Sequence, residues 1–189
     1  MRRPAAPWQS TADQAAATGP RADREMMKRF RLSPMSPLIF TLTFGMLALP
    51  SALLVIGLIQ NSLLLIPALL LAATYAWVWV RMRPSRFVLH PWGLEVVWPL
   101  RQCKIPRHEI ADVRVVDGNA LRSEIGWSMR IGVGGLWGGF GWLWTKRRGV
   151  VQMYVSRTDH MVWLERTNGR PWLITPENTE AFVRALLLR

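Results

Sequence analysis

The sequence predicts an α+β protein in which a transmembrane helical hairpin precedes a mostly β domain. Three observations predict this fold class. Residues 32–80 contain no Asp, Glu, Lys or Arg and are dominated by Leu, Ile, Ala, Phe and Val. From residue 84 the pattern changes to short β-branched and aromatic runs separated by Gly, Pro and Asn, which are typical of strands. An amphipathic helical pattern closes the chain.

Residues 1–31 are expected to form a disordered, basic tail. The first 24 residues are rich in Ala, Pro, Gln, Thr and Gly, and Trp8 is their one large aromatic group. Such a segment cannot bury enough apolar surface to offset the entropy of ordering. Met26 and Met27 precede the basic flank and are alternative translation starts, because a chain that begins there would keep both the basic flank and the two spans.

The uncharged stretch predicts a hairpin over 32–83 with spans at about 37–59 and 63–80. Roughly 20 helical residues cross a hydrocarbon core of about 30 Å, so the stretch is long enough for two crossings. The polar triplet at 60–62 divides the two spans, and Ser36 followed by Pro37 suits a helix start. A soluble helix pair would normally show a polar face, and a cleaved signal would not resume its apolar run after Pro50.

Basic residues on both sides of the hairpin predict its orientation. Lys28, Arg29 and Arg31 precede the first span, Arg81 and Arg83 follow the second, and the connecting turn has none. By the positive-inside rule both ends of the hairpin, and therefore both termini of the chain, should lie in the cytoplasm.

Residues 84–189 are expected to form a small, strongly bent, mostly antiparallel sheet. Asn168-Gly169 is the strongest hairpin turn, and His90 to Gly93 forms another. A terminal helix begins after Thr175 and should plug the open end of the sheet with Phe182 and Leu186. The candidate strands are Arg86–His90, Leu94–Trp98, Arg101–Ile105, Ile110–Val116, Ser128–Gly132, Val150–Ser156, Met161–Thr167 and Pro171–Ile174.

Two segments of this domain carry a family resemblance. IPRHEIADVRVV and VWLERTNGRPWLITPENTEAFVRALL, separated by a glycine-rich middle, resemble the bacterial pleckstrin-homology-like (bacterial PH) domain family over about residues 86–189. The resemblance implies a bent barrel of about seven strands capped by a carboxy-terminal helix, and two transmembrane helices before the domain. The matching motifs are patterns of fold, and none of them is catalytic.

The glycine-rich middle and the basic triplet that follows it form the candidate site. The run Gly132 to Gly141 lacks the spacing of a phosphate loop, so we expect a flexible hairpin or loop whose aromatic residues pack on the sheet or enter the headgroup region. A basic triplet beside tryptophans on a tethered domain suggests contact with anionic lipid, and a solvated turn is the alternative. The residues of this candidate membrane contact are Lys146, Arg147, Arg148, Trp142 and Trp144.

Other chemistry finds little support in the sequence. His90, His108 and His160 are far apart, no serine occupies a nucleophile elbow, and Cys103 has no neighbour that would activate a thiolate. We expect no catalytic, metal or cofactor site. The formal net charge of +12 is spread between the tail and the domain, so no nucleic-acid partner is expected.

These observations predict a membrane-anchored, non-catalytic interaction or scaffolding module that faces the cytoplasm. A sheet edge or the domain surface would bind a protein partner or mediate self-association. The alternative function is peripheral sensing of anionic lipid headgroups by the domain. Because the two spans carry no ionisable group, a transport path formed by this chain alone is not expected.

Overall fold

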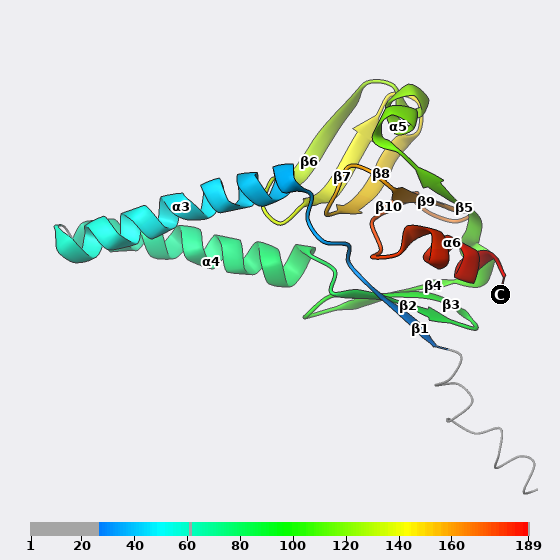
Figure 1. Cartoon of the computed structure of the whole chain (residues 1–189), viewed down its shortest axis with the longest axis horizontal. Coiled ribbons are helices and arrows are strands. Elements are labelled where there is room, and N and C mark those ends of the chain that lie inside the picture. Colours follow the sequence, from blue (N-terminus) through cyan, green and yellow to red (C-terminus); the bar gives the residue numbers. More distant parts are fainter. Residues whose placement is uncertain (1–26, 61, 189) are drawn as a thin grey trace, which may run out of the picture.

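A computed structural model describes residues 27–60 and 62–188 and shows a helical hairpin projecting from a domain of two sheets (Figure 1). The hairpin consists of α3 (Pro37–Ile59), a short 3-10 turn η1 (Ser62–Leu64) and α4 (Leu65–Met82). Both helices are long and apolar enough to cross a membrane, and they match the predicted spans. The tail prediction for residues 1–26 lies outside the described residues.

The two helices are joined by a hydrogen bond that compensates for a proline. Pro50 lies inside α3 and has no N–H, so it cannot donate to the carbonyl of Met46 one turn earlier. The Tyr75 hydroxyl of α4 donates to that carbonyl at 3.3 Å. A neighbouring helix thus satisfies the backbone group that the proline leaves free.

The first sheet contains four antiparallel strands in the order β1-β2-β3-β4: β1 (Lys28–Arg31), β2 (Arg86–His90), β3 (Gly93–Val97) and β4 (Gln102–Pro106). Strand β1 corrects the expectation of disorder through residue 31. Phe30 pairs with Phe87 of β2, and its ring packs edge-to-face on Phe182 at 5.3 Å. Apolar burial by Phe30 and pairing with β2 therefore order the basic flank.

Strand β1 ties both outer ends of the hairpin to one domain. It precedes α3 and pairs with β2, which follows α4, so the chain enters and leaves the hairpin at the same side (Figure 1). The Ser33 amide donates to the carbonyl of Thr175 at 2.8 Å, and the Ser156 hydroxyl donates to the carbonyl of Ser33 at 2.6 Å. At the other helix, the Trp98 indole donates to the carbonyl of Met82 at 3.1 Å.

The second sheet contains six strands in the order β5-β9-β10-β8-β7-β6, and all its pairs are antiparallel except β8 with β10. Its strands are β5 (Ile110–Val116), β6 (Ser128–Gly134), β7 (Gly139–Thr145), β8 (Gly149–Val155), β9 (Met161–Arg166) and β10 (Trp172–Ile174). The 3-10 turn η2 (Arg107–Glu109) and helix α5 (Gly118–Ile125) flank β5, and α6 (Thr179–Leu187) closes the chain.

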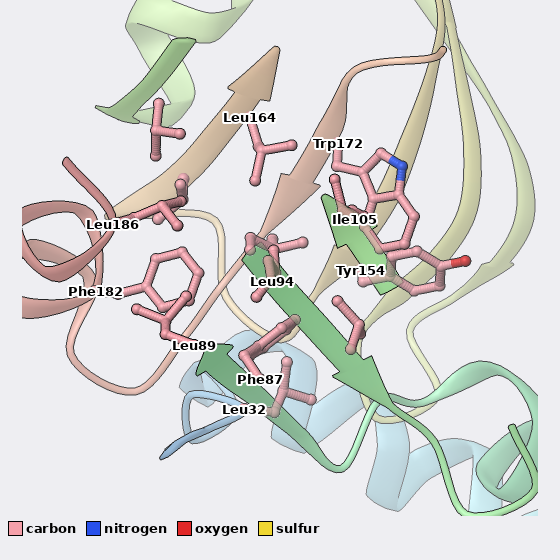
Figure 2. Packing of buried hydrophobic residues seen from close by; sticks show 14 of the residues in the cluster. Leu32, Phe87, Leu89, Leu94, Ile105, Tyr154, Leu164, Trp172, Phe182 and Leu186 are labelled. Carbon is pink, nitrogen blue, oxygen red and sulfur yellow. The ribbon is translucent and has the colours of Figure 1, made fainter. Parts of the chain in front are cut away.

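All eight expected strand regions contain strands, whereas β1, β7 and α5 were not expected. The described residues form two sheets of four and six strands, where the resemblance implied one bent barrel of about seven. The predicted helical plug is present. Phe182 is fully buried and packs against Phe87 of the first sheet at 6.1 Å, and Leu186 lies in the same cluster (Figure 2).

The second sheet has a core on each of its two faces. One face packs on the first sheet and α6 through residues such as Tyr154 and Trp172 (Figure 2). Phe140 belongs to the same cluster. The opposite face packs on α5, whose Leu121 and Ile125 are buried in a second cluster. The sheet is therefore covered on both sides over its centre.

Candidate interaction surface

An exposed cluster of large apolar side chains lies on β6 and β7, and we call it the aromatic face. Its members are between 44% and 63% exposed. Such contiguous exposed apolar groups on a folded domain usually mark a contact surface. The aromatic face consists of Trp127, Met129, Ile131, Trp142 and Trp144.

Strand register brings these side chains together. Met129 pairs with Trp144 and Ile131 pairs with Trp142 across β6 and β7. Trp127, which directly precedes β6, makes an edge-to-face contact with Trp144 at 6.1 Å. Cross-strand pairs lie close enough for aromatic and long side chains to contact one another, so the two strands build one continuous face.

The glycine-rich run forms the tip of the β6–β7 hairpin, which is one of the two expected forms, and two paired glycines explain how its strands approach each other. Gly132 and Gly141 lie opposite each other with φ values of 138° and 129°. A Cβ on either residue would lie within 2.5 Å of the backbone carbonyl oxygen of Phe140 or Ile131. These positions therefore require glycine. The run supplies the last residues of β6 and the first residues of β7, on either side of the connecting loop.

The aromatic face is the uncovered continuation of the domain's own core face. Along β7, Phe140, Trp142 and Trp144 point to one side of the sheet, since side chains alternate along a strand. Phe140 is fully buried under the first sheet, whereas Trp142 and Trp144 are 45% and 46% exposed. Leu143 points to the α5 side. The cover provided by the first sheet thus ends beyond Phe140.

Strand β6 also leaves a backbone edge open. It is the last strand in the order of the second sheet, so one of its two edges has no strand partner among the residues that the structure describes. An edge strand presents unpaired N–H and C=O groups that can accept a further strand. Met129 and Ile131 of the aromatic face lie on this same seven-residue strand.

The predicted basic triplet occupies the turn between β7 and β8, and two of its members hold α5. The Arg147 guanidinium donates to the carbonyl of Ser123 at 2.8 Å, and Arg148 donates to the Glu124 carboxylate at 2.6 Å. Hydrogen bonding from Arg114, followed by that from Arg148, lowers the pKa of Glu124. Within the described ranges the side chain of Lys146 has no hydrogen-bond or ion-pair partner.

The opposite end of the β6–β7 pair docks on the apolar helical hairpin. The Thr43 hydroxyl of α3 accepts from the amide of Trp137 at 2.9 Å. Its one hydrogen is shared between two carbonyl oxygens, that of Ile39 at 2.7 Å and that of Gly135 at 2.8 Å. The Trp137 ring packs edge-to-face on Trp79 of α4 at 4.8 Å. The five predicted site residues are thus divided: Trp142 and Trp144 share the aromatic face, and the triplet lies at the end of β7 remote from this docking loop.

The cysteine and the histidine described here make structural contacts and do not form a reactive site. Burial raises the pKa of the Cys103 thiol, which disfavours a reactive thiolate. His90 lies 2.7 Å from the Glu95 carboxylate and stacks on Trp92. Over residues 27–60 and 62–188 no three His, Cys, Asp or Glu side chains are placed to hold a metal ion.

Sequence reasoning missed Trp127, Met129 and Ile131, although a signal was present. These three residues alternate with polar residues in the period of two that a half-buried strand shows. Ser128–Gly132 was predicted as a strand, but its partner strand β7 was not, so the face that the two strands share was missed.

Comparison with known proteins gives one match. Residues 85–189, more than half of the chain, match the model of a family described as Bacterial PH domain. The match begins after the hairpin, and therefore includes neither β1 nor the two apolar helices. No curated protein and no solved structure matches the chain significantly.

Proposed function

Because this chain belongs to the bacterial PH domain family, we propose that it is a non-catalytic interaction module that a two-helix anchor holds at the bacterial inner membrane. Its domain faces the cytoplasm and binds a protein partner, or a second copy of the chain, through the aromatic face and the adjacent edge of β6. The process that this contact serves is set by the partner and not by chemistry of the domain itself.

The exposure of the aromatic face is the observation that carries this proposal. Five large apolar side chains on one sheet face remain about half exposed although the same face is fully buried a few residues away at Phe140. Tryptophan and other aromatic residues are enriched where protein interfaces concentrate their binding energy. A free strand edge beside them supplies backbone groups for strand addition.

The cytoplasmic orientation rests on charge. The basic residues of β1 and those that follow α4 lie at the domain end of the hairpin, and the far turn at Ser62–Leu64 carries no charge. Cytoplasmic flanks of membrane spans carry the excess of Lys and Arg.

Site-specific photo-crosslinking in living cells tests the protein-partner proposal. A photoreactive amino acid replaces Ile131 on the aromatic face and, as a matched control, Arg130, the adjacent β6 residue whose side chain alternates to the other side. We expect a discrete protein adduct from position 131 that is absent at 130. Equal adducts from both positions, or lipid adducts alone at position 131, would contradict the proposal.

Peripheral sensing of anionic lipid is the second candidate function, with Lys146, Arg147, Arg148, Trp142 and Trp144 as its proposed contacts. The observation that favours it is the exposed Lys146 side chain near two half-exposed tryptophans, since each cation near an anionic surface contributes about 1 kcal/mol. Arg147 and Arg148 also support α5, so reversing the whole triplet would disturb the fold.

A spin label at position 128, which pairs with Thr145 beside the basic turn, tests this second function while Lys146 stays in place. The full chain carries Ser128→Cys in a Cys103→Ser background and is placed in nanodiscs of either anionic or zwitterionic lipid. Lipid sensing predicts higher accessibility to oxygen and lower accessibility to aqueous nickel in the anionic discs. Identical accessibility in the two compositions would exclude it.

A further inference from the structure

The groove between α3 and α4 provides an inference that is independent of the aromatic face. A cavity of about 550 Å³ lies between the two helices. On α4 it extends from Ala68 to Trp79, and Trp137 of the domain forms part of its wall at the domain end. The hairpin and the domain therefore build this cavity jointly.

The lining of the groove selects an apolar occupant. Almost all of the side chains that line it are aliphatic or aromatic. Its two hydroxyl groups are already used, because Ser51 donates to the carbonyl of Leu47 at 2.9 Å and Tyr75 donates to that of Met46 at 3.3 Å. A polar ligand would find few groups with which to exchange the hydrogen bonds it makes to water.

The length of the groove matches one leaflet of a bilayer. Ala68 and Trp79 are 11 residues apart on α4, which corresponds to about 16 Å along the helix. Half of a hydrocarbon core of about 30 Å is about 15 Å. An acyl chain that starts at the domain end of the groove would extend to about the middle of the membrane.

An unneutralised cation lies at the domain end of the groove. The guanidinium carbon of Arg83 lies 4.2 Å from the centroid of the Trp79 ring, which lines the groove. Its Nε atom is buried without a hydrogen-bond partner, and no carboxylate pairs with it among the residues that the structure describes. A partly buried guanidinium of this kind is best satisfied by an anionic oxygen acceptor.

We propose that this groove binds one acyl chain of an anionic phospholipid of the surrounding bilayer, whose headgroup pairs with Arg83. The Trp79–Trp137 contact then places a domain residue beside the bound lipid, and the Thr43 hydroxyl fixes the loop that carries Trp137. The bound lipid becomes part of the junction between anchor and domain. This site is separate from the basic turn at the far end of β7.

Two pairs of variants of the full chain test the proposal by native mass spectrometry after extraction with its membrane lipids. Ala72→Phe places a ring inside the groove, whereas Ala73→Phe makes the same change on a neighbouring α4 residue outside the lining. Arg83→Gln removes the proposed headgroup partner, and Arg81→Gln removes an exposed cation of the last α4 turn.

We expect one anionic phospholipid to remain bound to the wild-type, Ala73→Phe and Arg81→Gln proteins during stepwise delipidation. It should be lost from Ala72→Phe, and Arg83→Gln should retain it about fivefold more weakly, as expected for one cation near an anionic headgroup. Because Arg83→Gln leaves the groove intact, the arginine pair decides the matter if Ala72→Phe does not fold.

Three results would overturn the proposal. The first is no retained lipid, or equal retention of zwitterionic and anionic lipid. The second is the same loss from both members of each pair. The third is a dimer that Ala72→Phe alone dissociates, because the occupant would then be a helix of a second copy.

Discussion

Replacing Thr43 by valine should loosen the contact between the helical hairpin and the β6–β7 strands. Thr43 is only 4% exposed, and its hydroxyl accepts from the Trp137 amide at 2.9 Å. Valine has nearly the same shape but no acceptor, so Thr43→Val leaves that N–H without its partner. An unsatisfied, partly buried donor costs about 1–3 kcal/mol.

Hydrogen exchange of the docking loop measures this cost directly. For local opening, about 1–3 kcal/mol corresponds to about 5- to 140-fold faster exchange, because about 1.4 kcal/mol is a factor of ten. We expect this acceleration at the amides of residues 135–138 of the full chain in nanodiscs. The strands on either side, β6 and β7, should change less because their ladder bonds remain.

A second threonine provides the matched control. Thr74 lies in α4, is exposed, and its hydroxyl donates only to the Leu70 carbonyl one turn earlier. Thr74→Val makes the same chemical change in a membrane helix without touching the domain. Equal exchange of the docking loop in Thr43→Val, Thr74→Val and wild-type protein would refute the account of this junction.

Two further predictions concern the domain. Phe182→Ala should lower the free energy of unfolding by about 3–5 kcal/mol, because Phe182 is fully buried between the two sheets, and Leu187→Ala on the exposed side of α6 should cost far less in the same denaturant titration in detergent. The lowered pKa of Glu124 means that its carboxylate stabilises the α5 contact above its ordinary pKa of 4.5, and that this contribution is lost as the pH falls through the lowered value. In an NMR titration of the Glu124 carboxyl group, Arg114→Gln should raise the pKa more than Arg148→Gln, because the hydrogen bond from Arg114 lowers this pKa most. A larger rise in Arg148→Gln would contradict that assignment.

The hairpin could be predicted because its signal is local. A run of 49 uncharged residues, with a polar break and flanking cations, specifies two spans without knowledge of the rest of the chain. The structure gives α3 the predicted bounds and ends α4 two residues later than predicted. The β9–β10 hairpin around Asn168-Gly169 was predictable for the same reason, since turns depend on nearby residues. The terminal helix was also predicted, but it begins at Thr179 and not directly after Thr175, because Asn178 is its N-cap and accepts from the amide of Ala181.

Strand β1 could not be predicted because its cause is distant in sequence. Lys28 to Arg31 looks like a cytoplasmic flank of a membrane span, and its pairing with β2 is created only when the hairpin returns the chain to the same place. Phe30 then gains Phe87 and Phe182 as neighbours. The family match begins at residue 85 and gives no indication of this strand either.

The candidate site was predictable only in part. The alternation of Phe140, Trp142 and Trp144 was visible, but the glycines around it were interpreted as flexibility, whereas two of them allow β6 and β7 to approach closely. The roles of Arg147 and Arg148 depend on α5, a helix that sequence analysis did not anticipate. Contacts with α5, which is distant in sequence, therefore determine which basic side chains of the turn are already hydrogen-bonded.

Membrane topology tests the central claim most directly, namely that two helices anchor a cytoplasmic PH domain. Single cysteines are introduced as Ser62→Cys at the far turn of the hairpin and as Asp159→Cys on the exposed domain surface, each with Cys103→Ser. A membrane-impermeant thiol reagent is then added to intact spheroplasts and to lysed ones. We predict that position 62 is labelled in intact spheroplasts and that position 159 is labelled only after lysis. Labelling of position 159 from outside, or protection of position 62 until lysis, would contradict the account.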